Sequence, residues 1–374
     1  MSDGKDDDAG KEPTSASDDT TPGVPADVRT TSGGAGGGSE SGHGARTSDS
    51  GATRAAAASA RADLTAAAAA AARAGGAARP TTALAVVAPS SNAVATFGRM
   101  IKFSHTIFAL PFALAAAVLA ARDHRLSFWR LLGIVVAMAG ARTAAMGFNR
   151  IVDRNIDAKN PRTARRELPT GAVSVNAAWM LTLISTAVFV GAAAFLGRLC
   201  LELAPIALLF LFGYSYTKRF TFLCHLFLGL AIAAGPAGAW IAVRGDFALT
   251  PALLMVAVAT WIGGFDILYA IADAEFDRKS GLHSIPARFG VVRSLQISGA
   301  LHGITSGTLI AVAFSAHLGV PYLIGLAVVI GLLIWEHAIV TPDDLSRLDL
   351  AFFNLNGYVS VVFFLATLAD VMLR

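Results

Sequence analysis

The sequence predicts an all-α, polytopic membrane protein. Three observations support this fold class. Of the 374 residues, 54% are apolar and only 15% are charged. From about residue 98 onward, apolar stretches long enough to cross a bilayer follow one another, and short polar loops separate them. Because lipid offers the backbone no hydrogen-bond partners, each stretch must satisfy its own polar groups, as a helix does. No stretch shows the alternation of a β-barrel strand.

About nine transmembrane helices are expected. The predicted spans are 99–121, 129–149, 175–196, 200–217, 221–243, 250–272, 292–315, 319–338 and 351–372. The fourth span is the weakest, because it is short and contains Pro205. Together they form one expected membrane domain, 95–374.

The first 90 residues differ in composition from the rest. They are rich in Ala, Gly, Ser, Thr and Asp and nearly lack aromatic and large aliphatic residues. Such a tract buries too little apolar surface to offset its ordering entropy, so we expect 1–90 to be a disordered, low-complexity tail. Its acidic start without an apolar segment argues against a signal peptide, and its many acids argue against an organelle transit peptide.

Lysine and arginine are distributed unevenly over the predicted loops. Twelve lie in the loops after the second, fourth, sixth and eighth spans, and five lie in the opposite loops. The positive-inside rule therefore places the first set, and the N-terminal tail, in the cytoplasm. Basic loops in a membrane protein indicate contact with anionic lipid, and no nucleic-acid motif is present. We expect an integral protein of the cell (inner) membrane without a nucleic-acid partner.

Two acidic motifs lie at the ends of predicted spans on this cytoplasmic side. Asn149, Asp153 and Asp157 are spaced by four residues, as are Asp273 and Asp277. On a helix this spacing stacks the side chains on one face, about 6 Å apart. Stacked carboxylates repel one another and are costly near a bilayer unless a positive group binds them. Hard oxygen ligands on two facing helix ends suit Mg²⁺ held between the protein and a substrate diphosphate.

Basic residues lie close to both motifs. The loop after the first motif is a clamp suited to phosphate oxygens, with Lys159, Arg162, Arg165 and Arg166. The loop after the second motif includes Lys279. An ordinary positive-inside loop is the alternative interpretation of both. Because each motif ends a span and precedes a basic loop with a proline, the two halves form a weak pseudo-repeat, with the expected cavity between them.

Two further helical positions carry polar groups below these loops. Tyr214 and Lys218 share a helical face at the end of the fourth span. Arg142 and Asp266 each lie two helical turns, about 10 Å, deeper than the motif on their own span. Charges inside a membrane are functional by default, and these two residues are able to meet across a cavity. A purely structural ion pair is the alternative, and we expect His105 and His225 to be packing residues.

In these residues the chain resembles the UbiA superfamily of intramembrane prenyltransferases, and within it the 4-hydroxybenzoate polyprenyltransferase-like branch. The resemblance covers about residues 95–374. The sequence motifs that carry it are specific to the family when they are taken together. They are Asn149-x-x-x-Asp153-x-x-x-Asp157, Arg162-Thr163-Ala164-x-Arg166-x-Leu168-Pro169-x-Gly171, Tyr214-x-x-x-Lys218, Asp266-x-x-Tyr269-Ala270-x-x-Asp273-x-x-x-Asp277, Gly281 and Ser284. Two departures, Arg150 and Glu167, spare the metal-ligand positions and bear only on the subfamily.

The resemblance implies a central cavity open to lipid, and two Mg²⁺ ions around a polyprenyl diphosphate. It implies that an allyl cation forms and that an electron-rich aromatic ring attacks it. The implied metal ligands are Asn149, Asp153, Asp157, Asp273 and Asp277. The four aspartates and Asp266 are the expected catalytic residues, and Arg142 is expected to face the carboxylate of the acceptor. The expected diphosphate-binding residues are Asn149, Lys159, Arg162, Arg166, Tyr214, Lys218 and Lys279.

We therefore expect a Mg²⁺-dependent aromatic prenyltransferase of quinone biosynthesis, a monomer or loose oligomer in the bilayer. The expected acceptor is 4-hydroxybenzoate, with a dihydroxynaphthoate of menaquinone synthesis as the alternative. Prenyl transfer to a haem or chlorin precursor fits the basic loop less well. An inverted-repeat transporter and an inactive scaffold are alternatives from other classes. Transport does not need carboxylates at this spacing beside phosphate-clamping arginines, and a scaffold is expected to lose metal ligands, none of which is missing.

Overall fold

The computed structural model describes residues 96, 98, 100 and 106–374, so the predicted tail, 1–90, lies outside the described residues. Within the described part the chain is helical and contains no strand. The elements are α3 (Thr106–Ala120), α4 (Phe128–Asp157), α5 (Val175–Leu196), α6 (Arg198–Thr217), α7 (Cys224–Arg244), α8 (Leu249–Ala270), η2 (Ile271–Asp273), α9 (Ala274–Lys279), α10 (Ile285–Ser315), α11 (Val320–Ile339), η3 (Leu350–Leu355) and α12 (Asn356–Met372).

The helices match the predicted spans one for one. Eight described helices are long and apolar enough to cross a membrane, and α3 is a shorter apolar helix of 15 residues. The predicted first span begins at residue 99, and 101–105 lie outside the described residues. The weakest predicted span is the 20-residue helix α6, which contains Pro205. α10 begins before the predicted 292, because a kink at Gly290, with a φ of 78°, separates its first turn from the span. The predicted all-α membrane fold is confirmed.

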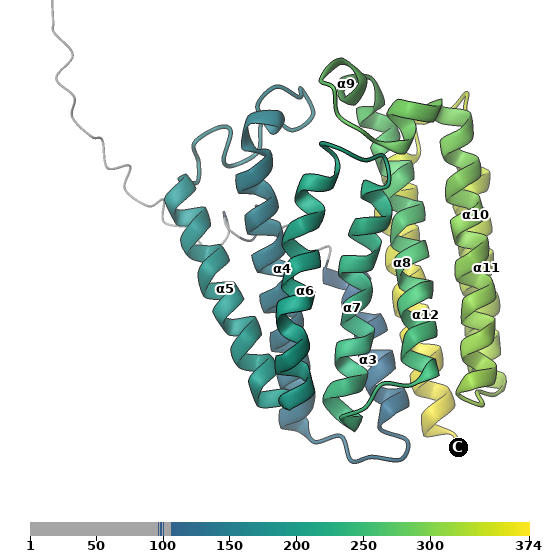
Figure 1. Ribbon diagram of the computed structural model, residues 1–374. Coiled ribbons are helices and arrows are strands. Elements are labelled where there is room, and N and C mark those ends of the chain that lie inside the picture. Colours follow the sequence, from purple (N-terminus) through teal and green to yellow (C-terminus); the bar gives the residue numbers. More distant parts are fainter. Residues whose placement is uncertain (1–95, 97, 99, 101–105) are drawn as a thin grey trace, which may run out of the picture. The chain divides into compact units, whose positions relative to one another are not determined.

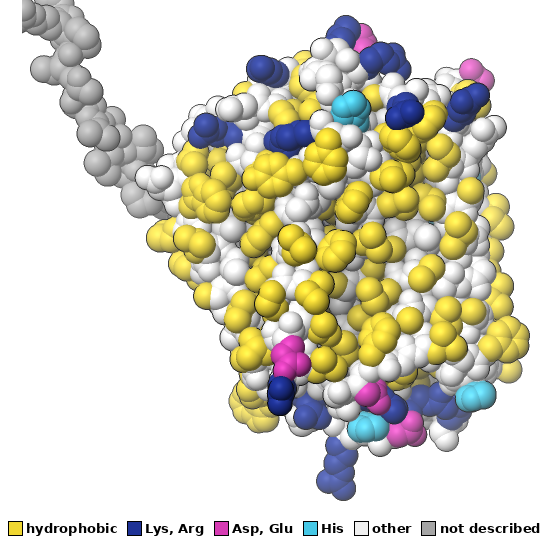
Figure 2. All heavy atoms as spheres, viewed as in Figure 1, with side chains coloured by type: hydrophobic (Ala, Val, Ile, Leu, Met, Phe, Trp, Pro, Cys, Tyr) yellow, Lys and Arg dark blue, Asp and Glu magenta, His cyan; other side chains and the backbone are white. Residues whose placement is uncertain are grey.

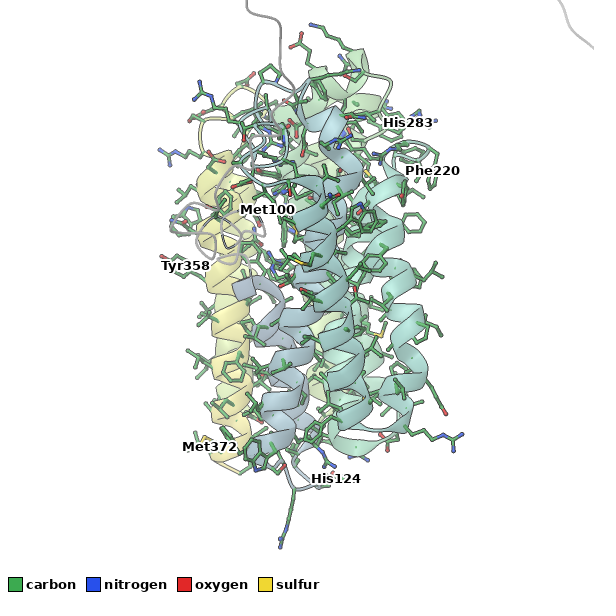
Figure 3. All side chains as sticks on the ribbon, turned by 90° about the vertical axis from the view of Figure 1, so that its left-hand side faces the viewer. Met100, His124, Phe220, His283, Tyr358 and Met372 are labelled. Atoms are coloured by element: carbon green, nitrogen blue, oxygen red, sulfur yellow. The ribbon has the colours of Figure 1, made fainter. Side chains whose placement is uncertain are left out.

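Successive long helices run in alternating directions and are joined by short loops, so both acidic motifs end at the same side of the bundle (Figure 1). α9 lies at this side and the C-terminus at the other. Figure 3 shows the same separation, with Phe220 and His283 near the motif end and His124 and Met372 at the opposite end. In Figure 2 charged side chains gather at both ends of the bundle, and a broad hydrophobic band lies between them. This distribution is that of a bilayer-spanning protein.

The second half of the bundle packs around α3 and α8. α8 packs against α7 and α10, whereas α3 packs against α7 and α12. Phe112 of α3 joins these layers, because its ring lies 4.9 Å from that of Trp261 on α8 and 4.4 Å from that of Phe363 on α12. In the first half, α4 packs against α5 and α6. The result is one group of helices, α3 with α7–α12, beside a second group, α4–α6.

Close approach between α7 and α8 depends on Gly229. A methyl group added there would overlap the carbonyl oxygen of Ala259 on α8. A backbone oxygen cannot move aside without shifting its helix, so only glycine fits this crossing. Because α7 carries one wall of the cavity described below, the crossing fixes where that wall stands.

We expect Gly229→Ala to destabilise the protein by roughly 1–3 kcal/mol through overpacking. Gly303→Ala is the matched control, since nothing lies within 4 Å of a methyl group at that position. It should leave the free energy of unfolding unchanged or raise it, because alanine favours the helix. Thermal unfolding in detergent measures both. Equal midpoints for the two variants would show that the α7–α8 crossing is not constrained by Gly229.

Candidate active site

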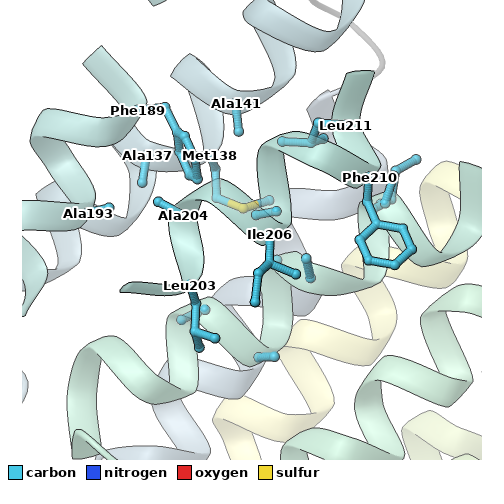
Figure 4. Close-up of a pocket in the computed structure, with 18 of the residues that line it drawn as sticks. Ala137, Met138, Ala141, Phe189, Ala193, Leu203, Ala204, Ile206, Phe210 and Leu211 are labelled. Carbon is cyan, nitrogen blue, oxygen red and sulfur yellow. The ribbon is translucent and has the colours of Figure 1, made fainter. Parts of the chain in front are cut away.

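A cavity of about 640 Å³ lies among α4, α5, α6 and α7 (Figure 4). Its wall is almost entirely apolar and includes Met138 of α4, Phe189 of α5 and Phe210 of α6. Arg142 and Tyr214 are the charged or hydroxyl-bearing side chains of the wall. We predicted a cavity between the two halves of the pseudo-repeat. This one is lined chiefly by α4–α7, with Ala109 of α3 and Met255 of α8 also in its wall.

The first acidic motif lies on the last two turns of α4, as the four-residue spacing predicts. Asn149 Nδ2 donates to Asp153 Oδ2 at 3.0 Å, so these two side chains share one face. Asp153 Oδ1 accepts a hydrogen bond from Arg219 at 2.9 Å. Asp157 is buried, and one nitrogen of Arg166 contacts its two carboxylate oxygens at 2.7 and 2.8 Å. Each carboxylate of this motif therefore has its own arginine.

The second motif differs from the prediction in its backbone. We expected Asp273 and Asp277 on one continuous helix, but α8 ends at Ala270. Asp273 ends the 3₁₀ turn η2, and Asp277 lies in the short helix α9. Both carboxylates are nevertheless buried at the same end of the bundle as the first motif. The turn changes the direction of the chain above the membrane, which a regular four-residue spacing cannot reveal.

Side chains from two other loops pair with the second motif. Arg162 holds Asp273 through two of its nitrogens, with Nε 2.8 Å from Oδ1. Asn160 donates to the same oxygen at 2.9 Å. Lys218 Nζ lies 2.8 Å from Asp277 Oδ1. Arg162 also donates to the hydroxyl of Tyr269 at 2.5 Å, which fixes the guanidinium against α8.

These contacts join the two motifs into one site. The loop after α4 holds its own Asp157 through Arg166 and reaches the other motif through Arg162. The loop after α6 likewise reaches both motifs, since Lys218 pairs with Asp277 and Arg219 with Asp153. The expected repulsion between stacked carboxylates is thus offset by four cations that alternate with four anions. A separate hydrogen bond, from His283 N–H to the Lys218 carbonyl oxygen at 2.8 Å, ties the loop after α9 to the same cluster.

The pairing stabilises the charged forms of the basic groups. Burial disfavours the Lys218 ammonium, but its contact with Asp277 raises the pKa of Lys218 above its ordinary value. Partial burial likewise disfavours the Arg162 guanidinium, and its hydrogen bonds to Asp273 raise the pKa of Arg162. Both groups are therefore cations at neutral pH. The site presents fixed positive charge beside carboxylates, which is the charge pattern that a metal–diphosphate complex requires.

The carboxylates fit a divalent cation as partial ligand sets. Asp277 is fully buried, and neither of its oxygens makes a hydrogen bond, although Lys218 lies within ion-pair distance. A buried carboxylate with unused acceptor positions is suited to bind a cation. No cluster of three or more His, Cys, Asp or Glu side chains able to hold a metal occurs among the described residues. One or two carboxylates are nevertheless a common donor set for Mg²⁺, which completes its shell with phosphate and water.

Deeper in the bundle lie the two predicted charges. Arg142 lines the cavity between α4 and α6. Asp266 Oδ2 lies 2.6 Å from Nδ1 of His225, on α7. His225 is buried, so besides packing between helices it makes a polar contact with Asp266.

Two predicted diphosphate-binding residues lie outside the cluster. Lys279 is exposed on α9 and pairs with Glu275 at 2.6 Å. It is two positions, about 200° of helix, from Asp277, and so it faces away from that residue. Lys159 is exposed in the loop after α4. The departure Arg150 is buried, donates to the Met100 carbonyl oxygen at 3.3 Å and lies 4.0 Å from Asp157.

Relatives of known sequence agree with this geometry. The UbiA prenyltransferase family matches residues 109–360, two thirds of the chain. This chain belongs to the UbiA prenyltransferase family. It is 32% identical to the 4-hydroxybenzoate octaprenyltransferase of Pseudomonas aeruginosa over 244 residues, which cover 65% of this chain and 82% of that protein. The protein of the same name from Nitrosospira multiformis is 30% identical over 246 residues, 65% of this chain and 83% of that one. This UbiA chain is therefore a prenyltransferase and an integral membrane protein.

Solved structures of the family share its fold. The apo structure of a UbiA homologue from Aeropyrum pernix K1 is 35% identical, with a TM-score of 0.66 over 71% of this chain and 98% of that one. A UbiA homologue from Archaeoglobus fulgidus bound to GPP and Mg²⁺ has a TM-score of 0.58 at 20% identity, over 73% and 99% of the two chains. At that identity the second likeness concerns the fold alone.

The site geometry predicts the effect of Arg162→Ala on the metal-free protein. Buried Asp273 loses its charged partner, so the free energy of unfolding should fall by roughly 1–3 kcal/mol. Arg165→Ala, in the same loop and exposed, is the control and should change it by less than about 0.5 kcal/mol. Unfolding in detergent with a chelator measures both. A loss for Arg165→Ala as large as that for Arg162→Ala would contradict the assigned pairing.

Proposed function

We propose that this chain transfers a polyprenyl group from a polyprenyl diphosphate to an aromatic acid of the 4-hydroxybenzoate type, in a Mg²⁺-dependent reaction of ubiquinone or related quinone biosynthesis. One observation carries the proposal. Four carboxylates and four cations, interleaved at one end of the bundle, adjoin an apolar cavity whose polar residues lie toward that end. Charge for a diphosphate and apolar space for a prenyl chain are thus adjacent.

The metal ligands proposed are those of the two motifs. Asn149, Asp153 and Asp157 would hold one ion, and Asp273 and Asp277 the other, with phosphate oxygens completing each shell. When bound, Mg²⁺ would neutralise the charge of the diphosphate and so make the diphosphate a better leaving group. The burial of the Asp277 carboxylate, whose Oδ2 has no hydrogen-bond partner, supports this assignment.

Basic side chains are proposed to bind the diphosphate by exchanging partners. Arg162, Arg166, Lys218 and Arg219 now neutralise the motif carboxylates. When a metal takes those carboxylates, the same cations are released to bind phosphate oxygens, with arginine offering two parallel donors. Tyr214 lies one turn below Lys218, on the cavity wall, where a hydroxyl would meet the phosphate nearest the prenyl carbon. Lys159 and Lys279 face solvent and are proposed to attract the anion only.

The apolar cavity is proposed to hold the prenyl chain and exclude water. Its wall extends from Tyr214 and Arg142 to Leu196 and Phe247, near the opposite end of α5 and α7. A dry cavity protects an allyl cation from water, so that the aromatic ring captures it instead.

The acceptor is proposed to lie at the depth of Arg142 and Asp266. A guanidinium is suited to a carboxylate, and Asp266 would accept a hydrogen bond from the ring hydroxyl, which raises the electron density of the ring. The names of the relatives favour 4-hydroxybenzoate. A dihydroxynaphthoate carries the same two groups and is the second candidate. The transporter and scaffold alternatives are set aside by family membership.

The proposed setting is the cell (inner) membrane, with both motifs facing the cytoplasm, where Mg²⁺ and diphosphates are found. The uneven distribution of Lys and Arg supports this orientation. A monomer or loose oligomer is proposed.

The function is tested by supplying purified protein in lipid with Mg²⁺, a radiolabelled polyprenyl diphosphate and each acceptor in turn. We expect a prenylated 4-hydroxybenzoate, and none when a chelator is present. A product formed only from the naphthoate would move the assignment to menaquinone synthesis, and no aromatic product from either acceptor would refute the proposal.

Arg142→Ala should chiefly weaken use of the acceptor. Loss of a desolvated charge pair costs roughly 2–5 kcal/mol, and lysine should restore only part of it, because an ammonium lacks the bidentate fork. The KM for the prenyl diphosphate should change little. The KM values for the acceptor and for the prenyl diphosphate are measured in each variant. An equal rise in both would show that Arg142 binds the diphosphate instead of the acceptor.

A further inference from the structure

His225 and Asp266 form a pair inside the membrane domain that the motif clusters do not include. Nδ1 of His225 lies 2.6 Å from Oδ2 of Asp266. The histidine side chain is 3% exposed, whereas that of the aspartate is 24% exposed. The accessible part of the pair is therefore the carboxylate, and the imidazole lies behind it. In this arrangement Asp266 is the group that a substrate can reach, and His225 is the residue that holds it in place.

The second ring nitrogen defines the protonation of the histidine. The backbone N–H of Ile285 points at Nε2 of His225, with a separation of 3.4 Å. A backbone amide only donates, so Nε2 is the acceptor in this contact. Of the two neutral tautomers, the contact selects the one that carries its proton on Nδ1 and donates it to Asp266. In this form the histidine stabilises the ionised carboxylate.

Ile285 connects this pair to the second acidic motif. It is the first residue of α10, where a backbone N–H has no partner within its own helix. The loop before it, 280–284, contacts that motif, because the N–H of Leu282 donates to the Asp277 carbonyl oxygen at 2.9 Å. The same loop contacts Lys218 through His283. His225 therefore stands between the carboxylate of Asp266 and a loop whose position depends on the diphosphate end of the site.

We propose that His225 is a positioning residue for the acceptor. It fixes Asp266 as an ionised, correctly turned carboxylate by donating from Nδ1, while the α10 amide holds its ring through Nε2. This inference rests on the proposed function, in which Asp266 receives the ring hydroxyl of the acceptor. The other titratable groups next to the pair, among the described residues, are Cys224, whose thiol contacts the His283 carbonyl oxygen, and His302 of α10, whose ring packs against Gly264.

A double-mutant cycle separates positioning from general stability. His225→Ala should lower kcat/KM for the acceptor by roughly 10–100-fold, as loss of an orienting partner does elsewhere. In a protein that already carries Asp266→Asn, the same change should have little further effect, because the group that it positions is gone. His225→Gln should restore most of the turnover, since its amide offers one donor and one acceptor. The KM for the prenyl diphosphate should stay nearly constant throughout.

The pH profile provides a readout that a structural role would not change. The Nδ1–H donor favours the charged carboxylate, so its loss should make acceptor use more sensitive to acid. The acid limb of kcat/KM for the acceptor should therefore move to higher pH in His225→Ala and return in His225→Gln. His124→Gln is the control: an exposed histidine at the opposite end of the bundle, whose substitution should leave this limb unchanged.

The results separate the two proposals. Suppose that the wild-type protein is active, but that the losses of kcat/KM in His225→Ala and Asp266→Asn multiply in the double variant, or that the acid limb does not move. Either result would overturn the role of His225 and leave the proposed function standing. The absence of any prenylated aromatic product from the wild-type protein would overturn the proposed function, and this inference with it. Non-additive losses, recovery with glutamine and a shifted limb together would support the role of His225.

Discussion

Charge compensation at one edge of the membrane domain is the constraint on which the site depends. Four carboxylates, two at the end of α4 and two in η2 and α9, would repel one another if left alone. Arg166 and Arg162 from one loop, and Lys218 and Arg219 from another, offset this repulsion. Because each loop serves both motifs, the pairs also draw the two halves of the bundle together. The same pairs are weak points, since a metal–diphosphate complex offers each charge an alternative partner.

Packing of the helices determines what lies beneath this cluster. α7 and α8 approach closely at Gly229, and a large apolar cavity lies among α4–α7. Its wall contains few polar groups, and these lie toward the cluster. Leaving-group chemistry and apolar binding are therefore separated along the membrane normal, within a distance that one amphipathic substrate spans. The His225–Asp266 pair is a further polar site, below the charged cluster. Through the contact of His225 with Ile285, this pair is connected to the loop that follows α9.

The sequence predicts the helices and the composition of the cluster well, because both depend on local patterns. Span lengths follow from hydropathy, and the spacing of Asn149, Asp153 and Asp157 follows from the period of α4. Contacts between loops are not encoded in any local period. Nothing in the sequence alone assigns Arg219 to Asp153 or Asn160 to Asp273, and the turn at Ile271 interrupts a regular spacing without a proline or glycine. The outward orientation of Lys279, however, could have been predicted from the sequence, because Lys279 follows Asp277 by two residues.

The account rests on the claim that the motif carboxylates hold the metal, and turnover of four single variants at increasing Mg²⁺ tests it most directly. Each of Asp153→Asn, Asp157→Asn, Asp273→Asn and Asp277→Asn removes a ligand charge while keeping the side-chain shape. Asp246→Asn, at the opposite end of the bundle beside Arg244, is the control. We expect each motif variant to lose turnover by ~100-fold or more, without recovery at saturating Mg²⁺, and the control to retain it. Near-normal turnover of all four motif variants would contradict the account.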